Sequence, residues 1–234
     1  MAAVLLSGGL DSRVILACLH NLVDSDQLYA LSFGARGCDD VRYAREVSRL
    51  LKVEHHYIEL KPNYLLAFAE DGVELTDGMT NIIHFHALVT QQLGVEHASL
   101  AYKGLFGDTL MGIPSDRYHV AKYQSDDMPF LNYAIFERFG VDNFKYKELD
   151  YLLVDSIRKE VGRQVLETFD IAMNESGSQI FADQLHYFLM RYRFPRFSLK
   201  GAELVRSKTP VRLPYCDNDL VDFALSIPPG LRIE

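Results

Sequence analysis

Val4-Leu5-Leu6-Ser7-Gly8-Gly9-Leu10-Asp11-Ser12-Arg13, near the start of the chain, is the stretch that decides the fold. An apolar run of strand length leads into a Ser-Gly-Gly turn, and apolar residues then recur at helical spacing over residues 11–21. The stretch therefore predicts a strand, a loop and a helix. Such a junction favours anion binding, because glycines let the backbone approach a ligand closely and a helix start offers unpaired N–H groups.

The side chains of this loop predict a nucleotide phosphate together with its metal. Ser7 and Ser12 add hydroxyl donors. Asp11 would repel a phosphate unless a cation such as Mg²⁺ lies between the two groups. The loop differs from the Gly-Lys-Ser/Thr phosphate loop, because it lacks the lysine that this motif requires. An ordinary strand-to-helix turn is the alternative interpretation.

The composition predicts one folded α/β domain, or one domain with an appendage. The chain has 234 residues, of which 48% are hydrophobic, so it can bury a sizeable core. Its net charge of −8 argues against a broad nucleic-acid surface, so we expect no nucleic-acid partner. Cys18, Cys38 and Cys216 are widely separated, which favours a reduced, cytoplasmic protein. Because no apolar run approaches the roughly 20 residues of a membrane span, we expect no membrane partner.

Strands alternate with helices in the first half of the chain. The alternation predicts a parallel, doubly wound α/β sheet, in which ligands bind beyond the carboxyl ends of the strands. We expect residues 1–112 to form a nucleotide-binding half and residues 113–234 a helical half packed on it. Further strands are expected at 27–33, 54–60 and about 97–102, and further helices at 39–51, 62–75 and 80–93.

A second glycine-rich loop follows the strand expected at 97–102. It reads Gly104-Leu105-Phe106-Gly107-Asp108-Thr109-Leu110-Met111-Gly112 and carries one carboxylate. Because neighbouring strands of such a sheet end in one crevice, Asp11 and Asp108 are predicted to share a cation there. Mg²⁺ usually takes one or two protein carboxylates and completes its shell with water and phosphate oxygens. A solvated aspartate between glycines is the alternative.

Three ordered motifs resemble the synthetase domain of the asparagine synthetases, which belongs to the N-type ATP pyrophosphatase, or PP-loop, superfamily. Residues 7–12 resemble its pyrophosphate-binding loop, and residues 103–112 resemble its motif Ser-Gly-Glu-Gly-Ser-Asp-Glu-Leu-Phe-Gly. Val211-Arg212-Leu213-Pro214-Tyr215-Cys216-Asp217, with the helix that ends at Pro228-Pro229, is similar to its third motif. The resemblance implies an adenine-nucleotide-α-hydrolase-like sheet with a helical C-terminal half.

The resemblance also implies which residues contact the nucleotide. The loop at residues 7–12 would hold the pyrophosphate end of ATP, and the metal would lie between Asp11 and Asp108. Adenosine would lie against backbone atoms of Leu6 and Leu31 and the turn at Gly104. No catalytic residue is assigned, and the expected cofactors are ATP and Mg²⁺. The residues expected at ATP and its pyrophosphate are Leu6, Ser7, Gly8, Gly9, Asp11, Ser12, Leu31 and Gly104.

The activity implied by this resemblance is that of an AMP-forming C–N ligase. A small-molecule carboxylate attacks the α-phosphate of ATP, an acyl-adenylate forms with release of pyrophosphate, and ammonia or an amine displaces AMP to form an amide. Catalysis would rest on positioning and charge stabilisation. Leu105 stands where the family has a Glu beside its amino-acid substrate, and Lys103 stands where it has a Ser. The Leu105 departure argues against asparagine as the product.

Two parts of the family's machinery lie outside this sequence. Its glutamine-hydrolysing domain would precede the first strand, and its catalytic Lys would follow the Pro-Pro helix. We therefore expect nitrogen to come from a separate glutaminase, another amine-supplying partner or free ammonia. A non-catalytic or truncated ATP-binding subunit is one alternative. Another adenylating PP-loop enzyme, such as a tRNA-modifying one, is the second; the net charge and the isolated cysteines count against a tRNA substrate.

Three further groups receive structural or binding roles. His84 and His86 fall in an expected helix, which favours a surface or site-lining role over metal binding. The aromatic residues Phe181, Tyr187 and Phe188 are expected in the core. The last group either binds an anion or lies solvated at a helix end; it consists of Arg191, Arg193, Arg196 and Lys200.

Overall fold

The computed structural model describes residues 1–92, 98–111 and 153–232. The chain divides into two compact units, the first made of Met1–Met111 with Arg193–Ile227 and the second of Gly112–Tyr192 with Pro228–Glu234. The expected division at residue 112 stays a prediction. In the described ranges, no helix combines the length and the apolar character needed to cross a lipid bilayer.

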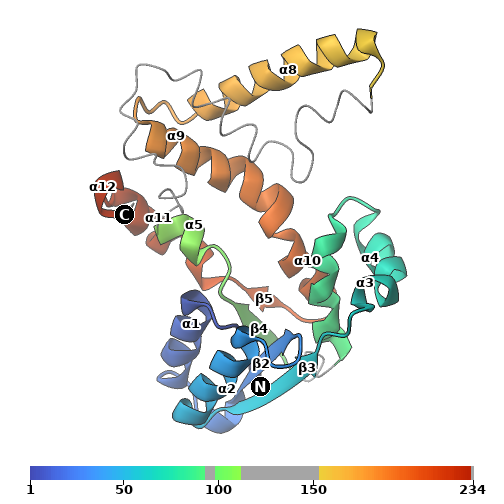
Figure 1. Ribbon diagram of the computed structural model, residues 1–234. Helices are drawn as coiled ribbons and strands as arrows, with labels where there is room; N and C mark the ends of the chain where they lie inside the picture. Colours follow the sequence, from blue (N-terminus) through green and yellow to red (C-terminus); the bar gives the residue numbers. More distant parts are fainter. Residues whose placement is uncertain (93–97, 112–152, 233–234) are drawn as a thin grey trace. The chain divides into compact units, whose positions relative to one another are not determined.

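A five-stranded sheet in which all neighbouring strands are parallel forms the centre of the first unit (Figure 1). The strand order is β3-β2-β1-β4-β5, so the chain first builds outward on one side of β1 and then returns to its other side. This order confirms the predicted parallel, doubly wound class, and the crevice of such a sheet lies where the order reverses, between β1 and β4. The strands are β1 (Ala2–Leu5), β2 (Leu28–Gly34), β3 (Glu54–Glu59), β4 (Leu100–Lys103) and β5 (Val211–Arg212).

The register aligns the carboxyl ends of β1 and β4, while β2 continues to Gly34. Leu5 of β1 lies opposite Leu31 of β2 on one side and opposite Lys103 of β4 on the other. Consequently the loops that follow β1 and β4 leave the sheet at the same level. The two glycine-rich segments are thereby brought to one edge.

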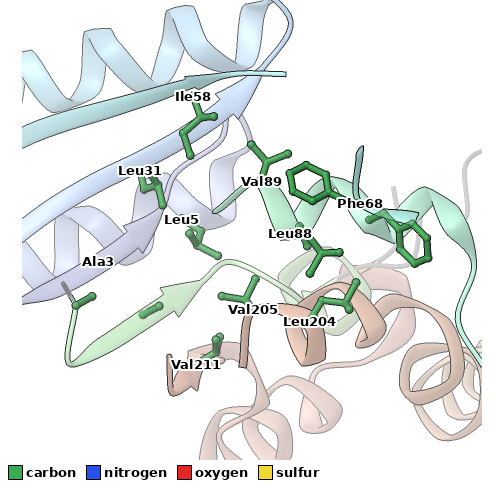
Figure 2. Close-up of a cluster of buried hydrophobic side chains, with 14 of the residues drawn as sticks. Ala3, Leu5, Leu31, Ile58, Phe68, Leu88, Val89, Leu204, Val205 and Val211 are labelled. Carbon is green, nitrogen blue, oxygen red and sulfur yellow. The ribbon is translucent and has the colours of Figure 1, made fainter. Parts of the chain in front are cut away.

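Alternation along β1 divides the core of the first unit into two layers, because successive side chains of a strand point to opposite faces. Val4 and Leu6 pack with α1 (Leu10–His20) and α2 (Asp39–Leu51) on one face. Ala3 and Leu5 point to the other face, where Leu88 and Val205 cover the sheet (Figure 2). Leu88 and Val205 come from the 3₁₀ segment η2 (Ile82–Gln92) and from α10 (Lys200–Arg206).

Helix α2 spans the predicted residues 39–51, whereas the helix expected at 62–75 is divided. Phe68, with φ −111° and ψ 7°, leaves helical geometry and separates α3 (Tyr64–Ala67) from α4 (Ala69–Thr76). Phe68 is also buried in the cluster of Figure 2, so tertiary packing fixes its position. The remaining short helices of this unit are α5 (Gly107–Met111), α11 (Asn218–Ser226) and the 3₁₀ turns η1 (Ser25–Gln27) and η9 (Pro214–Cys216).

The second unit contains α8 (Asp155–Asn174), α9 (Phe181–Phe188) and α12 (Pro229–Arg232). The ring of Phe188 meets that of Phe169 edge-on, with centroids 4.9 Å apart. Phe181 and Phe188 are buried, as expected, and Tyr187 is partly buried. The π-helical segment η8 (Leu189–Ser198) follows α9.

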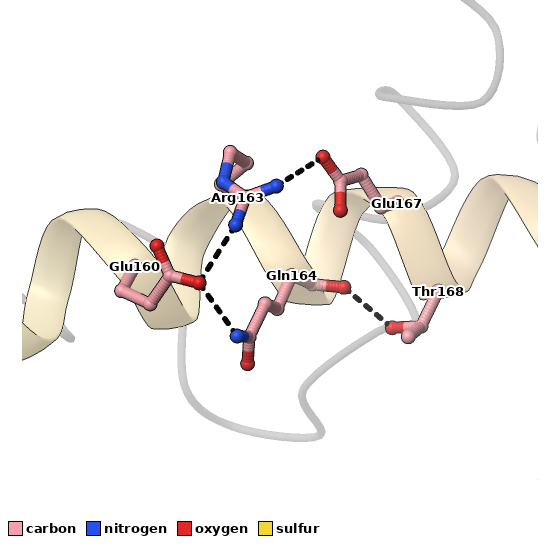
Figure 3. A network of polar contacts seen from close by, with 5 residues as sticks. All are labelled: Glu160, Arg163, Gln164, Glu167 and Thr168. Atoms are coloured by element: carbon pink, nitrogen blue, oxygen red, sulfur yellow. Dashed lines mark hydrogen bonds and ion pairs between the residues drawn. The ribbon is translucent and has the colours of Figure 1, made fainter.

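Helix α8 carries a polar network on an exposed face (Figure 3). Arg163 bridges Glu160 and Glu167 at 2.7 and 2.8 Å, and Gln164 donates to Glu160 at 2.6 Å. Such exposed pairs one helical turn apart are screened by water and support the helix only weakly. We therefore assign this network no functional role.

Candidate functional site

The loop between β1 and α1 is held together by its own serines. Ser12, which is buried, accepts a hydrogen bond from the Ser7 N–H at 3.1 Å, and Ser7 Oγ accepts one from the Gly9 N–H at 3.2 Å. The hydroxyl of Ser12 is therefore engaged inside the loop. Ser7 Oγ also lies 3.1 Å from Ser12 Oγ, but Ser7 is exposed and its hydroxyl is open to a ligand.

Asp40, at the start of α2, contacts the same loop. The Gly8 N–H donates to Asp40 Oδ1 at 2.8 Å, and a Cβ at position 8 would lie 2.8 Å from that oxygen. Only glycine allows this approach without displacing the carboxylate. In this structure Gly8 therefore gives its N–H to Asp40, which leaves the Ser7 hydroxyl and the start of α1 as the loop's groups for an anion.

Two glycines of the second loop bring it against the first. A Cβ at Gly104 would lie 2.5 Å from the backbone nitrogen of Ser12, and a Cβ at Gly107 would lie 2.5 Å from the carboxyl carbon of Asp11. Both distances are far shorter than van der Waals contact. A side chain at Gly104 would force the two backbones apart, and one at Gly107 would displace the Asp11 carboxylate. The close contact between the loops therefore requires glycine at positions 104 and 107 of the second motif.

Asp11 and Asp108 are brought together at this contact. The backbone N–H of Asp108 donates to Asp11 Oδ2 at 3.2 Å. Burial raises the pKa of Asp11, the negative charge of Asp108 raises it further, and the N–H of Asp108 lowers it. A divalent cation would offset this repulsion, and two carboxylates suit Mg²⁺ with nucleotide phosphates. The described residues contain no group of three or more acidic, His or Cys side chains with metal-binding geometry, so the shared cation stays a prediction.

Tyr215 links the third motif to the first. Its hydroxyl donates to the backbone oxygen of Asp11 at 3.3 Å, across 204 positions of the sequence. Asp217 then starts α11, because its side chain accepts hydrogen bonds from the N–H groups of Asp219 and Leu220. All three motifs therefore meet within the first unit.

Phe106 lies in the left-handed backbone region, with φ 85°. The family motif has Gly at this position, and left-handed backbone is unfavourable for a bulky residue. Phe106 is buried, and its ring centroid lies 4.4 Å from that of Phe194. This packing offsets the unfavourable backbone and fixes the turn immediately before Gly107.

A cavity of about 260 Å³ lies at the ends of β1, β2 and β4. Of the residues expected at the nucleotide, five line it, namely Leu6, Ser7, Ser12, Leu31 and Gly104. Gly8, Gly9 and Asp11 are not part of this lining, and neither is Asp108. The other lining residues are Leu5, Phe33, Asp40, His86, Ala87, Lys103 and Val205.

Lys103 is one of the lining residues that were not expected in the site, and it carries a positive charge. Burial lowers its pKa to about 8. The signal was present in the sequence, because Lys103 directly precedes Gly104 at a strand end. This signal is weak, because a lysine at a strand end is more often exposed to solvent.

His84 and His86 lie near Lys103. His84 is only 7% exposed and does not line the cavity, so neither position expected for the pair, surface or site-lining, holds for it. His86 lines the cavity and packs against Phe33. Burial, helped by the nearby His86 and Lys103, lowers the pKa of His84 to about 4 and leaves its ring neutral at neutral pH. The Nε2 atom of His84 is buried with no hydrogen-bond partner in the described structure.

The basic group at 191–200 is partly engaged within the protein. Lys200 forms an ion pair with Glu203 at 2.8 Å, and the guanidinium of Arg193 lies 4.6 Å from the ring centre of Phe197. None of the four basic residues lines the cavity. The anion-binding role of this basic group stays a prediction.

A larger cavity of about 740 Å³ lies along α2 and the edge strand β3. Its lining includes the exposed side chains Arg36, Arg42, Arg45 and Arg49, and none of the residues expected at the nucleotide. Arg42 is paired with Asp39 at 2.8 Å. We place the candidate site in the smaller cavity, because the first two motifs contribute lining residues to it and none of the three motifs contributes to the larger one.

One family model matches a range of the chain that contains all three motifs. The family described as asparagine synthase matches residues 2–234. The chain belongs to the asparagine synthase family. Together with the relatives below, this membership supports an ATP-using enzyme of the PP-loop superfamily.

Curated relatives of this asparagine synthase-family chain match over shorter segments. A probable glutamine-hydrolysing asparagine synthetase of Acanthamoeba polyphaga mimivirus is 43% identical over 54 residues, which are 23% of this chain and 10% of that protein. The 7-cyano-7-deazaguanine synthase of Aquifex aeolicus is 36% identical over 81 residues, or 32% of this chain and 36% of that protein. The chain therefore spans about a third or less of these relatives.

Among solved structures, a predicted tRNA methyltransferase subunit from Methanocaldococcus jannaschii is 18% identical, with 44% of this chain and 51% of that chain covered. Its TM-score is 0.31, a likeness too slight to bear on the fold.

Proposed function

We propose that this chain is an ATP-dependent, amide-forming ligase that activates a small carboxylic acid as its acyl-adenylate and releases pyrophosphate. The main support for this proposal is the contact between the two glycine-rich loops. It sets Asp11 against the N–H of Asp108 beside a cavity that the expected nucleotide residues line. Membership in the asparagine synthase family supports the same reaction class.

In this mechanism the chain contributes position and charge. Backbone groups at Leu6, Leu31 and Gly104 would orient the adenosine, and the loop at residues 7–12 would hold the departing pyrophosphate. Asp11 and Asp108 would hold Mg²⁺, which supplies positive charge to the phosphates when bound. Leu105 makes the acid pocket less polar than one with Glu, so we propose an acid other than aspartate.

The second substrate is proposed to be ammonia or another amine. The mimivirus relative is named as glutamine-hydrolysing, which supports a glutaminase as the nitrogen source. We propose that this activity lies on a separate partner or segment. We also propose a cytoplasmic location and no nucleic-acid partner, in line with the net charge of −8.

One second candidate has an observation in its favour. Two 7-cyano-7-deazaguanine synthases, from Aquifex aeolicus and Leptospira interrogans, match at 36% and 43% identity over 81 and 68 residues. These matches favour a PP-loop enzyme that adenylates a heterocyclic acid. The two candidates share ATP activation and differ in the acid.

Exchange of labelled pyrophosphate into ATP tests the proposal. The purified chain would be incubated with Mg²⁺-ATP and a panel of amino acids, aliphatic acids and a 7-deazaguanine carboxylic acid. We expect one class of acid to support exchange, and the class decides between the two candidates. ATP binding without exchange for any acid would leave a non-catalytic ATP-binding subunit and would overturn the ligase proposal.

A further inference from the structure

We propose that Lys103 binds the α-phosphate of the nucleotide and acts there as the cation of the activation site. The inference rests on the proposed use of ATP. It adds a residue that neither the motifs nor the family assignment gives a role.

The position of Lys103 follows from the sheet. It is the last residue of β4 and lies opposite Leu5, and the next residue is Gly104. Strand alternation places its side chain on the same face as Ala101, which packs against η2 and α10. A Cβ at Gly201 of α10 would lie 3.5 Å from Lys103 Nζ, so the ammonium extends along the sheet face to that helix.

The ammonium of Lys103 has no partner in the described part of the protein. No hydrogen bond or ion pair to it is formed by any described residue, although its surroundings bury it enough to lower its pKa to about 8. The Lys103 side chain is partly buried, and a lysine drawn out of water is usually paired, because an unpaired charge there is unfavourable. An unpaired ammonium that lines a cavity is therefore a site for an anion.

The neighbouring titratable groups leave this charge unneutralised. His84 and His86 of η2 face Lys103, and burial lowers the pKa of both rings, so neither is charged near neutral pH. Arg193 acts on His84 and adds positive potential. Asp40 also lines the cavity, but its Oδ1 accepts from the Gly8 N–H. That hydrogen bond does not remove the negative charge of Asp40, but Asp40 forms no ion pair with Lys103. Lys103 therefore remains unneutralised among the described residues.

The α-phosphate is the anion that fits this location. In the proposed pose, adenosine lies against Leu31 and Gly104, and pyrophosphate lies at the loop that begins with Ser7. The α-phosphate joins these two parts and must pass through the cavity that all of these residues line. Among the described lining residues, Lys103 supplies the positive charge there. Because negative charge at the α-phosphorus is redistributed during acyl transfer, a fixed cation at this place would assist the reaction.

Binding of adenosine and AMP separates an α-phosphate contact from other roles of Lys103. Calorimetry would compare the wild type with Lys103→Met, Lys103→Arg and Lys61→Met, the last changing an exposed lysine of the same unit outside the cavity. We expect Lys103→Met to weaken AMP binding roughly 10- to 100-fold, as for loss of a charged hydrogen bond, and to leave adenosine binding within about twofold. Lys103→Arg should restore part of the loss, and Lys61→Met should bind AMP as the wild type does.

The pH dependence supplies an independent readout. Above pH 7.5 the AMP phosphate and the two histidines no longer titrate, so AMP affinity of the wild type should fall between about pH 8 and 10, as Lys103 loses its proton. Lys103→Arg should show no such fall, because arginine stays protonated. Pyrophosphate affinity should be independent of Lys103.

Three results would overturn the inference: AMP affinity unchanged in Lys103→Met, equal losses for AMP and adenosine, or AMP affinity that does not vary between pH 8 and 10. The proposed ligase activity is judged separately by pyrophosphate exchange of the wild type. AMP binding that depends on Lys103 without any exchange would keep this inference and remove the ligase. Exchange together with normal AMP binding by Lys103→Met would do the reverse.

Discussion

Replacing Lys103 by Met should make the protein more stable while it impairs the site. Met has a similar length, and it would occupy the space between η2 and α10 without an ammonium group. The surroundings lower the pKa of Lys103 from 10.5 to about 8. At about 1.4 kcal/mol for each pH unit, this corresponds to roughly 3 kcal/mol of destabilisation by the charged form, which we treat as an upper limit. We expect a gain of about 1–3 kcal/mol in the free energy of unfolding at pH 7.

The gain should disappear as the pH rises. A lysine whose pKa is lowered in the folded state holds its proton more tightly in the unfolded chain. Its destabilising effect is therefore complete below about pH 8 and is lost between about pH 8 and 10.5, where stability of the wild type rises relative to the variant. At pH 10 the difference between the two proteins should be below about 1 kcal/mol.

Urea unfolding of both proteins at pH 7 and pH 10 gives the stability difference between variant and wild type at each pH. The titration of all other groups cancels when the two differences are compared. Lys103→Arg is the matched control, because it keeps its charge at both pH values: it should not exceed the wild type at pH 7 and should be less stable than the wild type at pH 10, where lysine has lost its proton. A Lys103→Met variant no more stable than the wild type at pH 7 would refute the reasoning. An equal gain at both pH values would refute it too, since the gain would then come from apolar packing.

Four further substitutions test the site and its frame. Gly104→Ala should lower stability by about 2 kcal/mol or more in urea unfolding, because the new Cβ would lie 2.5 Å from the backbone nitrogen of Ser12, which has no freedom to move; an unchanged midpoint would contradict the contact. Gly107→Ala should instead displace the Asp11 carboxylate and weaken Mg²⁺-ATP binding in calorimetry more than it lowers stability. Asp217→Ala should cost about 1 kcal/mol in the same unfolding assay through loss of the α11 cap. Arg163→Ala should leave the unfolding midpoint unchanged, because its contacts are exposed (Figure 3).

Local patterns were enough to predict the sheet and the meeting of its loops. The alternation around β2 and β3 and the amphipathic spacing of α2 are local properties, so they could be read from the sequence. The contact of Asp11 with Asp108 followed from the rule that parallel strands end in one crevice. Both inferences required only short segments and their order.

Other features depend on contacts between distant segments. The strand β5 has two residues, too few for a periodic signal. The break at Phe68 arises because its side chain is buried in the cluster with Leu88 and Leu204. Lys103 is partly buried beside η2 and beside α10, the latter about a hundred positions further along the chain. No local pattern could indicate that this strand-end lysine lacks a partner.

The shared metal site of Asp11 and Asp108 is tested most directly by ATP affinity, measured by calorimetry with and without Mg²⁺ for the wild type, Asp11→Asn and Asp108→Asn. Both variants keep the backbone N–H of Asp108 that contacts residue 11. Each should lose roughly tenfold or more in Mg²⁺-ATP affinity, and each should bind metal-free ATP at least as well as the wild type, because a carboxylate that repels phosphate is gone. Unchanged Mg²⁺-ATP affinity in both variants would contradict the account.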